Sequence, residues 1–568
     1  MSFLSSSTRK DPFSKREAKA PLKSLRFVFV KRFGLVVKVL CEHHKKNKNP
    51  KHMGPLFLCV WPFFVMRLCY LVVYLREKDF AMTTIPWTQT TTRAATRGGG
   101  GGGGGGLFWT RFCDEGGQRR RRLFWGENII IRRHKGGRGK ENGSTTTTVR
   151  CTAVDQSLNP RVANLNESKT VALTDLARTL RERGEDVIGL AAGEPDFETP
   201  EVCAKAGVKA IEDGKTKYSP NQGTVPLREA VCEKLKRENG VEYTPSEIVI
   251  SNGAKQSVTQ AVLTCCGPGD EVIVPAPYWV SYPEMVTLSG AKKVILKTNI
   301  ESNFLITPGQ LGKAITPKSR MLILCSPSNP SGAVYSKETL QKICEIVTKH
   351  PRLLVLWDEI YEHIIYAPNE HVSVASFPDM RERTIVVNGF SKSFAMTGWR
   401  LGYSAAPEHF SKAFNMLQSQ LTSGPSSIAQ EAALAGYVEL GNKGGTPVET
   451  MRKKFQERRD YVIERLRKID GVEIETPGGA FYAFPDVTKL CGGEKGGFVE
   501  GFGPVKGSDE MCRYLLQEAR VALVPGSAFG VDECIRISYA ASDETLKKAL
   551  DRITEALDPK KFKRSGSW

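Results

Sequence analysis

The feature that most constrains the fold is a regular alternation of apolar strands and helices, which begins near Leu158. Short runs rich in Val, Ile and Leu end in polar loops, and helical patterns follow them. Strands that are apolar along their whole length are typical of a parallel sheet with helices on both faces. We therefore predict an α/β fold with a mostly parallel central sheet, whose strands include Glu247–Ser251, Glu271–Val274, Arg320–Cys325, Leu353–Trp357 and Thr384–Val387.

The chain after about Val448 has a different pattern. The helical segment Val448–Lys468 is followed by strand-like pieces and by a last helix, Ser542–Ala556. This arrangement predicts a smaller α+β domain at the C-terminus. We expect an N-terminal arm at 153–195, a large domain at 196–445, the small domain at 446–560 and a tail at 561–568.

The first 150 residues have a composition unlike that of the rest of the chain. They hold 30 Lys and Arg against 9 Asp and Glu, whereas residues 151–568 hold 51 against 52. The main body therefore has no basic excess, which excludes a nucleic-acid-binding surface spread over it. Ten of the 14 Cys lie in this body without a CxxC pair, which favours a reducing compartment and argues against a structural metal site.

Residues 82–152 resemble an organelle transit peptide. They contain nine consecutive glycines, Gly98–Gly106, and they are basic, rich in Ser and Thr, and poor in acidic residues. This composition predicts a disordered segment that directs the protein to the chloroplast stroma and is cleaved near Cys151–Val154. A basic tail that is retained is the alternative.

Residues 1–81 form a doubtful extension. Met82 offers another start, and we interpret the segment before it as untranslated sequence. Its apolar stretch, 55–75, is long enough to span a bilayer. However, Pro62 and Arg67 interrupt the stretch, and inserting an arginine costs about 2.5–3.5 kcal/mol, so a membrane anchor is not expected.

Polar and aromatic side chains follow the predicted strands. In an open parallel sheet, ligands bind at the carboxyl ends of the strands. We therefore expect one shared site for the residues that follow five of these strands, at Asn252–Lys255, Pro277–Trp279, Ser326–Gly332, Asp358–Tyr361 and Ser391–Lys392.

Lys392 is the strongest candidate in this set. A lysine at a buried strand end is a poor structural residue, because its charge needs a partner. Burial lowers the pKa of such an amine and suits it to Schiff-base formation. Arg400, eight residues later, offers a forked anion clamp, which favours a functional site over an exposed loop lysine.

The acid, the amide and the aromatic residue each have two interpretations. Asp358 can cap a helix, or it can keep the nitrogen of a pyridine ring protonated. Tyr361 and Asn329 could contact a phenolic oxygen of that ring, although the Asn-Pro sequence alone predicts a turn. Trp279 offers a flat face for ring stacking, although an aromatic residue after a strand is more often core.

Two further positions could bind anions. Gly253, Ala254 and Lys255 open a predicted helix, whose free N–H groups could bind a phosphate. Arg536 alternates with apolar neighbours on a predicted strand. An inward-pointing arginine there needs an anion, which is either a neighbouring acid or a substrate carboxylate.

Together these motifs resemble the class I, fold-type-I aminotransferases that depend on pyridoxal 5′-phosphate, with small amino and 2-oxo acids as substrates. The similarity runs from about Leu158 to Pro559, and Ala192–Phe197 and Pro277–Tyr282 further resemble the prokaryotic-type aspartate aminotransferases. Plant plastid members of that subgroup also convert prephenate to arogenate. The motifs that carry the resemblance are Ser-Asn-Pro-x-Gly (328–332), Asp-Glu-Ile-Tyr (358–361), Ser-Lys-x-Phe-Ala-Met-Thr-Gly-Trp-Arg (391–400) and Ile-Arg-Ile-Ser-Tyr (535–539).

The resemblance implies how the cofactor is bound. Lys392 joins the cofactor aldehyde as a Schiff base and moves a proton, and Asp358 pairs with the ring nitrogen. Tyr361 and Asn329 bind the ring hydroxyl, and Trp279 stacks on the ring. The residues implied in phosphate binding are Gly253, Ala254, Lys255 and Arg400, with Tyr218 reaching the phosphate of the neighbouring subunit in a homodimer. Ser391 is a further residue expected to contact the cofactor.

The resemblance also implies the substrate contacts. Arg536 takes the α-carboxylate, and Lys255 meets the distal carboxylate of aspartate, glutamate or prephenate. Two substrates use one pocket in turn, so the kinetics are expected to be ping-pong. The residues implied in substrate binding are Gly193, Trp279, Asn329, Arg536, Lys255 and Thr170.

Other enzymes of this fold are alternatives: an aromatic or alanine aminotransferase, or a lyase such as aminocyclopropane carboxylate synthase. A cofactor-binding transcription regulator is a more remote alternative, because residues 1–150 supply no helix-turn-helix domain.

One position departs from the family pattern. Many relatives have a phosphate-binding serine three residues before the lysine, where this chain has Gly389.

Overall fold

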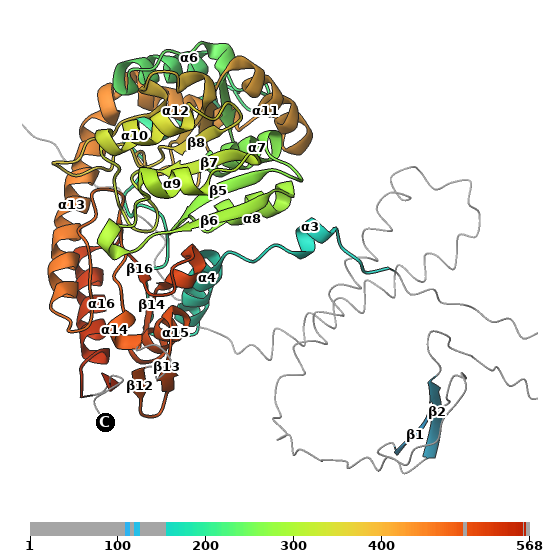
Figure 1. Ribbon diagram of the computed structural model, residues 1–568, viewed down its shortest axis with the longest axis vertical. Coiled ribbons are helices and arrows are strands. Elements are labelled where there is room, and N and C mark those ends of the chain that lie inside the picture. The colour runs from blue at the N-terminus through green and yellow to red at the C-terminus, as the bar shows by residue number, and fades with distance from the viewer. Residues whose placement is uncertain (1–107, 114–118, 125–154, 492–496, 561, 564–568) are drawn as a thin grey trace, which may run out of the picture. The chain divides into compact units, whose positions relative to one another are not determined.

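The computed structural model describes residues 108–113, 119–124, 155–491, 497–560 and 562–563 (Figure 1). The chain divides into two compact units, Met1–Thr152 and Ala153–Trp568. In the first unit, β1 (Phe108–Cys113) and β2 (Arg119–Phe124) form an antiparallel pair. We expected no regular structure in this segment, but the aromatic residues of β1 favour a strand.

The apolar stretch 55–75, the glycine run and all of residues 1–81 lie outside the described residues. Within the part of the chain that the structure describes, no helix is both long and apolar enough to cross a membrane.

A seven-stranded sheet forms the centre of the second unit, in the order β4-β10-β9-β8-β7-β5-β6. Neighbouring strands are parallel except at β10, which runs antiparallel to β4 and β9. All five predicted strands lie in this sheet, so the predicted α/β fold with a mostly parallel sheet is confirmed. The strands are β4 (Ile248–Ser251), β5 (Glu271–Ala276), β6 (Lys292–Lys297), β7 (Ser319–Cys325), β8 (Leu354–Asp358), β9 (Thr384–Gly389) and β10 (Gly402–Ala405).

Helices cover both faces of this sheet, as the continuous apolar runs require. In β7, Met321 and Ile323 pack with side chains of α7 and α8 on one face, whereas Leu322 and Leu324 pack with those of α10 on the other. A π-helical turn, η3 (Leu235–Asn239), extends α6. The helices around the sheet are α5 (Glu201–Glu212), α6 (Val225–Lys234), α7 (Ala254–Cys265), α8 (Ser281–Ser289), α9 (Pro308–Ala314), α10 (Lys337–Val347), α11 (Glu408–Leu421) and α12 (Ser427–Glu439).

The C-terminal elements form small sheets with helices beside them, as Figure 1 shows in orange and red. The sheets have the orders β11-β16-β15 and β13-β12-β17. The long helix α13 (Gly445–Arg467) and the last helix α16 (Asp543–Ala556) match the two predicted C-terminal helices closely. The other elements are α14 (Thr488–Cys491), α15 (Ser508–Glu518), β11 (Tyr482–Ala483), β12 (Gly497–Val499), β13 (Gly503–Val505), β15 (Val524–Pro525), β16 (Ile535–Ser538) and β17 (Phe562–Lys563).

The segment expected as an N-terminal arm joins these C-terminal elements. After the short helix α3 (Pro160–Ala163) and α4 (Lys169–Glu182), β3 (Ile188–Gly189) pairs in parallel with β14 (Val521–Ala522). Lys169 Nζ at the start of α4 donates to Asp509 Oδ1 at 2.7 Å. This pairing brings α4 and the loop after β3 to the carboxyl edge of the central sheet, where they line a cavity.

Candidate active site

A cavity of about 430 Å³ lies where the carboxyl ends of the parallel strands meet α4 and the C-terminal elements. It unites the residues that follow β4, β5, β7, β8 and β9, as the sheet topology predicts. Of the 14 predicted site residues, Gly253 and Tyr218 do not line the cavity. The other 12 line the cavity: Thr170, Gly193, Ala254, Lys255, Trp279, Asn329, Asp358, Tyr361, Ser391, Lys392, Arg400 and Arg536.

Lys392 follows β9 and places its amine in the cavity. Its Nζ donates a hydrogen bond to the Gly193 carbonyl oxygen and lies 5.9 Å from the centre of the Phe481 ring. Burial, together with the nearby positive charge of Arg536, lowers the pKa of Lys392 from 10.5 to about 8. A large fraction of the amine is therefore neutral near pH 8, as nucleophilic addition to an aldehyde requires.

Asp358 ends β8 and is buried in the same cavity. The Tyr282 hydroxyl of α8 donates to its Oδ2 at 2.6 Å, and the Ile360 N–H donates to its Oδ1 at 3.1 Å. Burial raises the pKa of Asp358 from 3.8 to about 6 in spite of these hydrogen bonds. Among the described residues Asp358 forms no ion pair, so this carboxyl suits a cationic partner such as a protonated ring nitrogen.

Arg536 on β16 is buried, with 1 % of its surface exposed. Its Nη1 donates to Asn329 Oδ1 at 2.9 Å, and its Nη2 donates to the Ala191 carbonyl oxygen at 2.6 Å. Its Nε has no hydrogen-bond partner in the described part of the chain, where no acid pairs with it either. The structure therefore does not support the alternative of a salt bridge to a neighbouring acid, and the guanidinium is left for an anion.

Arg400 and the N-terminus of α7 face the same part of the cavity. Gly253 precedes α7 with a φ of 88°, and a Cβ atom there would lie 2.5 Å from Arg400 Nη2. Glycine therefore allows the arginine to approach the helix start. The first N–H groups of α7 have no side-chain cap, and with Arg400 they form a positively polarised wall that suits a phosphate.

Lys255, Trp279 and Thr170 form another wall. Lys255 Nζ lies 5.1 Å from the centre of the Trp279 ring, and burial and Arg400 lower the pKa of this amine. Thr170 Oγ1 on α4 is buried without a hydrogen-bond partner among the described residues. A cation and an unsatisfied hydroxyl thus offer a second anion-binding position in the cavity that Arg536 also lines.

The cavity residues that were not predicted include Tyr282, Cys325 and Tyr482. Tyr282 lies three residues after Trp279, a spacing that places two residues on one face of a helix, so this one could have been found. Cys325 is the last residue of a predicted strand. Tyr482 donates to or accepts from the Tyr361 hydroxyl at 2.8 Å, but no local pattern distinguishes it from a core tyrosine.

Gly389 faces Gly402 across the β9–β10 pair. A Cβ atom on Gly389 would lie 3.0 Å from Gly402 Cα, and one on Gly402 would lie 2.3 Å from the Ala254 nitrogen. The two glycines let α7 begin close to the sheet. The serine that the family pattern led us to expect at this position would therefore require a small shift of the neighbouring backbone.

Residues 185–553 match the sequence family of class I and II aminotransferases. The chain belongs to this family. It is 59 % identical to the bifunctional aspartate aminotransferase and glutamate/aspartate-prephenate aminotransferase of Petunia hybrida, over 71 % of this chain and 83 % of the relative. It is 56 % identical to an aspartate aminotransferase of Pinus pinaster, over 71 % of this chain and 81 % of the relative.

Solved aminotransferase structures share the fold. The aspartate aminotransferase of Rhizobium meliloti is 41 % identical with a TM-score of 0.67, and the comparison covers 71 % of this chain and 99 % of that one. The aspartate aminotransferase of Thermus thermophilus with maleate is 40 % identical with a TM-score of 0.65, covering 71 % of this chain and all of that one.

An aminotransferase of this family is expected to use pyridoxal 5′-phosphate, and the cavity residues fit that group. The buried carboxyl of Asp358 lacks a cationic partner among the described residues, and a protonated pyridine nitrogen would supply one. Lys392 offers an amine with a lowered pKa, and Arg400 with the start of α7 suits the phosphate.

Proposed function

We propose that this aminotransferase moves amino groups between aspartate or glutamate and 2-oxo acids, among them oxaloacetate, 2-oxoglutarate and prephenate, which yields arogenate. The observation that carries the proposal is the presence of two anion-binding positions in one cavity, Arg536 and Lys255 with Thr170. A substrate with two carboxylates needs two such anchors. The names of the Petunia and Pinus relatives, and the maleate of the Thermus structure, support a dicarboxylic substrate.

We further propose that the cofactor is held by the residues inferred from the sequence. Asp358 holds the ring nitrogen, Tyr361 and Asn329 hold the ring hydroxyl, and Trp279 stacks on the ring. The start of α7, Ser391 and Arg400 hold the phosphate. When bound, the cofactor supplies an aldehyde for the amine and an electron-poor ring that accepts the negative charge left on the substrate.

Lys392 is the residue proposed to carry out proton transfer. Its amine would hold the cofactor and would serve as the base that takes the Cα proton of the amino acid. A pKa of about 8 lets Nζ accept that proton and return it near neutral pH. The Gly193 carbonyl oxygen accepts a hydrogen bond from Nζ and so orients the amine.

Arg536 is proposed to bind the α-carboxylate. This contact directs the Cα–H bond of the substrate toward Lys392, because both side chains line the same cavity. Lys255 and Thr170 then select a substrate with a second carboxylate. The two half-reactions use these residues in turn, with the 2-oxo acid bound as the amino acid was.

Tyr218 supports a homodimer with shared active sites. Its side chain is 98 % exposed, which is unusual for a tyrosine and leaves its hydroxyl available to a second copy of the chain. We propose that it reaches the phosphate position of the partner subunit.

The basic, acid-poor composition of residues 82–152, with the plant origin of the Petunia and Pinus relatives, supports the chloroplast stroma as the location of the protein.

Replacing Lys392 with Ala tests the assignment of the catalytic amine. We expect the variant to lose the visible absorbance of the bound cofactor and to lower kcat for aspartate by at least roughly a thousandfold. Lys468→Ala, which removes an exposed lysine paired with Glu464, is the matched control and should change neither. Turnover retained in Lys392→Ala would refute the assignment.

A panel of donors and acceptors tests the substrate class. Purified protein is offered aspartate, glutamate, alanine and phenylalanine with 2-oxoglutarate, oxaloacetate and prephenate, and arogenate formation is measured. We expect the acidic donors to be preferred. A preference for alanine or phenylalanine would instead support the aromatic or alanine aminotransferase alternatives.

A further inference from the structure

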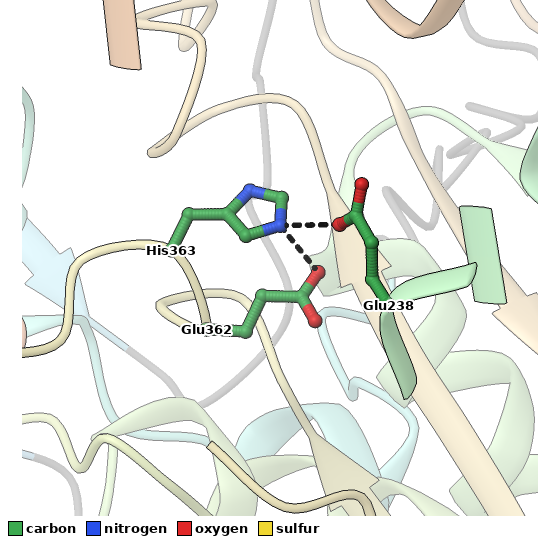
Figure 2. A group of neighbouring side chains, drawn as sticks. All are labelled: Glu238, Glu362 and His363. Carbon is green, nitrogen blue, oxygen red and sulfur yellow. Dashed lines mark hydrogen bonds and ion pairs between the residues drawn. The ribbon is translucent and has the colours of Figure 1, made fainter. Parts of the chain in front are cut away.

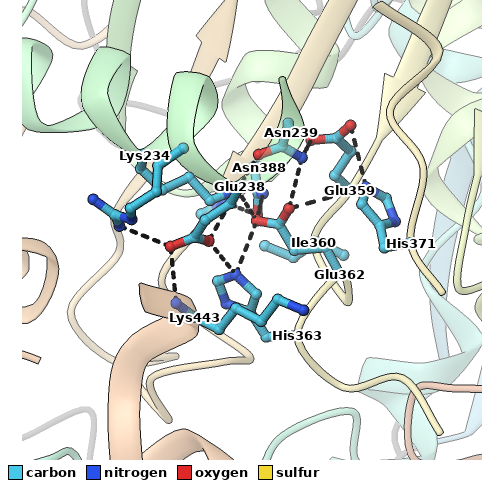
Figure 3. A network of polar contacts seen from close by, with 12 residues as sticks. Lys234, Glu238, Asn239, Glu359, Ile360, Glu362, His363, His371, Asn388 and Lys443 are labelled. Carbon is cyan, nitrogen blue, oxygen red and sulfur yellow. Dashed lines mark hydrogen bonds and ion pairs between the residues drawn. The ribbon is translucent and has the colours of Figure 1, made fainter. Parts of the chain in front are cut away.

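A second polar cluster lies buried next to the catalytic residues but outside the cavity. It comprises Lys234 at the end of α6, Glu238 and Asn239 on η3, Glu359, Glu362 and His363 after β8, and His371 and Asn388 (Figure 3). None of these side chains lines the cavity. The proposed mechanism uses none of them, yet burying several charged groups is costly unless they are paired.

The acids of this cluster converge in the way that metal ligands do. Figure 2 shows the carboxylates of Glu238 and Glu362 both directed at one ring nitrogen of His363, with Nε2 at 2.8 Å from Glu238 Oε2 and 3.6 Å from Glu362 Oε1. The positive charge between these acids, however, comes from a side chain of the protein itself. Lys234 Nζ, with none of its surface exposed, donates to Glu362 Oε1 and lies 3.9 Å from Glu238 Oε2. The ammonium therefore takes the place that a metal ion would need.

Glu362 is the centre of this cluster. Its Oε1 accepts hydrogen bonds from Lys234 Nζ and, at 2.5 Å, from Asn388 Nδ2, and its Oε2 accepts one from Asn239 Nδ2 at 3.0 Å. Three donors from three separate elements, α6, η3 and β9, thus fix one carboxylate. Burial alone raises the pKa of Glu362, but Lys234, with His363 and His371, holds that pKa well below its ordinary value, so the carboxylate stays ionised.

The bonds of Glu362 join two segments of the active site. Glu362 directly follows Tyr361, in the turn at 360–363 that comes after Asp358 at the end of β8. Asn388, near the end of β9, binds Glu362 through Nδ2 and accepts the Gly389 N–H at 2.7 Å through Oδ1. Gly389 ends β9, and Lys392 follows three residues later. The Glu359 N–H adds a bond to the Val387 carbonyl oxygen at 2.8 Å.

We propose that Glu362, balanced by Lys234 and bound to Asn388, is a positioning residue that sets the Asp358–Tyr361 turn relative to the Lys392 loop. Both segments would hold the same cofactor, so their relative position decides how well its ring and aldehyde are held at once. The inference rests on the proposed function, because it assumes that Asp358 and Lys392 bind that cofactor. The other titratable groups that face Glu362 are Glu238, Glu359, His363 and His371, and Arg237 Nη2 pairs with Glu238 at 2.8 Å.

Four variants of the full chain test this role. Glu362→Gln removes the charge but keeps the shape and one acceptor oxygen. Asn388→Ala removes the hydrogen bond between Glu362 and β9 but leaves the bonds of Glu362 to Lys234 and Asn239. We therefore expect this variant to fold even if Glu362→Gln does not. The double variant Lys234→Met/Glu362→Gln removes the two partner charges of the Lys234–Glu362 pair together. Glu464→Gln, at an exposed ion pair with Lys468, is the matched control.

Three quantities are measured for each variant: the urea midpoint of unfolding of the cofactor-free protein, the Kd for added pyridoxal 5′-phosphate, and the pH midpoint of the visible cofactor absorbance. We expect Glu362→Gln and Asn388→Ala to raise the Kd by roughly tenfold to a hundredfold and to move the pH midpoint by about half a unit or more, under conditions where both are fully folded. The double variant should recover most of both losses, because neither member of the Lys234–Glu362 pair is then left without its partner charge and the introduced glutamine still accepts from Asn388. The control should match the wild type.

A purely structural cluster would lower the unfolding midpoint of the single variants and leave the Kd and the pH midpoint unchanged, and that result would overturn the inference. A double variant that binds the cofactor no better than Glu362→Gln would also overturn it, because charge balance would then not position the turn. If the wild type itself takes up no pyridoxal 5′-phosphate, the proposed function fails and the inference with it. If the wild type binds the cofactor and the single variants bind it equally well, only the inference fails, so the two failures are distinguishable.

Discussion

Replacing Asp358 with Asn should stabilise the cofactor-free protein at pH 8 and have little effect near pH 4. The reason is that this carboxyl is buried without a cationic partner among the described residues, and burial raises its pKa from 3.8 to about 6. Between these two values the folded protein keeps a proton that the unfolded chain has lost. The free energy of unfolding therefore falls as the pH rises through this window.

The size of the effect follows from the difference between the two pKa values. A rise of about two units corresponds to about 3 kcal/mol, which is the cost of ionising the buried acid above about pH 6. At pH 5 roughly 1.4 kcal/mol of this cost is relieved, because the buried carboxyl is then mostly protonated. An asparagine carries no charge at either pH and still offers an oxygen to the Ile360 N–H and an amide to the Tyr282 hydroxyl.

Urea unfolding of the cofactor-free wild type and of Asp358→Asn, at pH 5 and pH 8, measures this difference. We expect the variant to exceed the wild type by about 3 kcal/mol at pH 8 and by roughly 1.5 kcal/mol at pH 5. Asp213→Asn, at an exposed aspartate paired with Lys209, is the control and should show no such change. A stability difference that is the same at both pH values, or a variant less stable than the wild type at pH 8, would refute the reasoning.

Three further substitutions test the anion-binding positions. Gly253→Ala should raise the Kd for pyridoxal 5′-phosphate by at least roughly tenfold, because its Cβ atom would lie 2.5 Å from Arg400 Nη2 at a φ of 88°; an unchanged Kd in a titration of the cofactor-free protein would contradict this. Arg536→Met should raise the KM of every amino donor by roughly 10- to 150-fold, since it removes a charged hydrogen-bonding partner of the α-carboxylate; steady-state kinetics showing a loss confined to acidic donors would be the contrary result. Lys255→Ala should lower kcat/KM for aspartate and prephenate by roughly tenfold or more and spare alanine, and an equal loss for all substrates would count against Lys255 as the selective anchor.

The sequence predicts the central sheet and most of the cavity wall for one physical reason. Strands buried on both faces must be apolar throughout, so the polar residue that ends such a run stands out, and parallel strands bring these ends to one edge. Asp358, Asn329 and Lys392 were found in this way. Arg536 was found because it interrupts an apolar alternation on β16.

The contacts across long sequence separations were beyond such reasoning. Tyr282 binds Asp358 from a helix 76 residues away, and Glu362 meets Lys234 across 128 residues. Each of these residues follows the local pattern of its own segment, so only the folded arrangement shows its partner. The antiparallel strand β10 was missed because its sequence, Gly-Tyr-Ser-Ala, contains none of the Val, Ile and Leu residues that mark the predicted strands. The pairing of β3 with β14 was missed because each of these strands has only two residues.

That pairing also bears on when the active site can form during synthesis. Lys169 and Asp509 are 340 residues apart in the chain, and Arg536 binds the Ala191 carbonyl oxygen across 345 residues. The helix that walls the cavity therefore leaves the ribosome long before the strands against which it rests. The catalytic pocket is therefore among the last parts of the protein to close, because its walls come from segments that lie hundreds of residues apart in the chain.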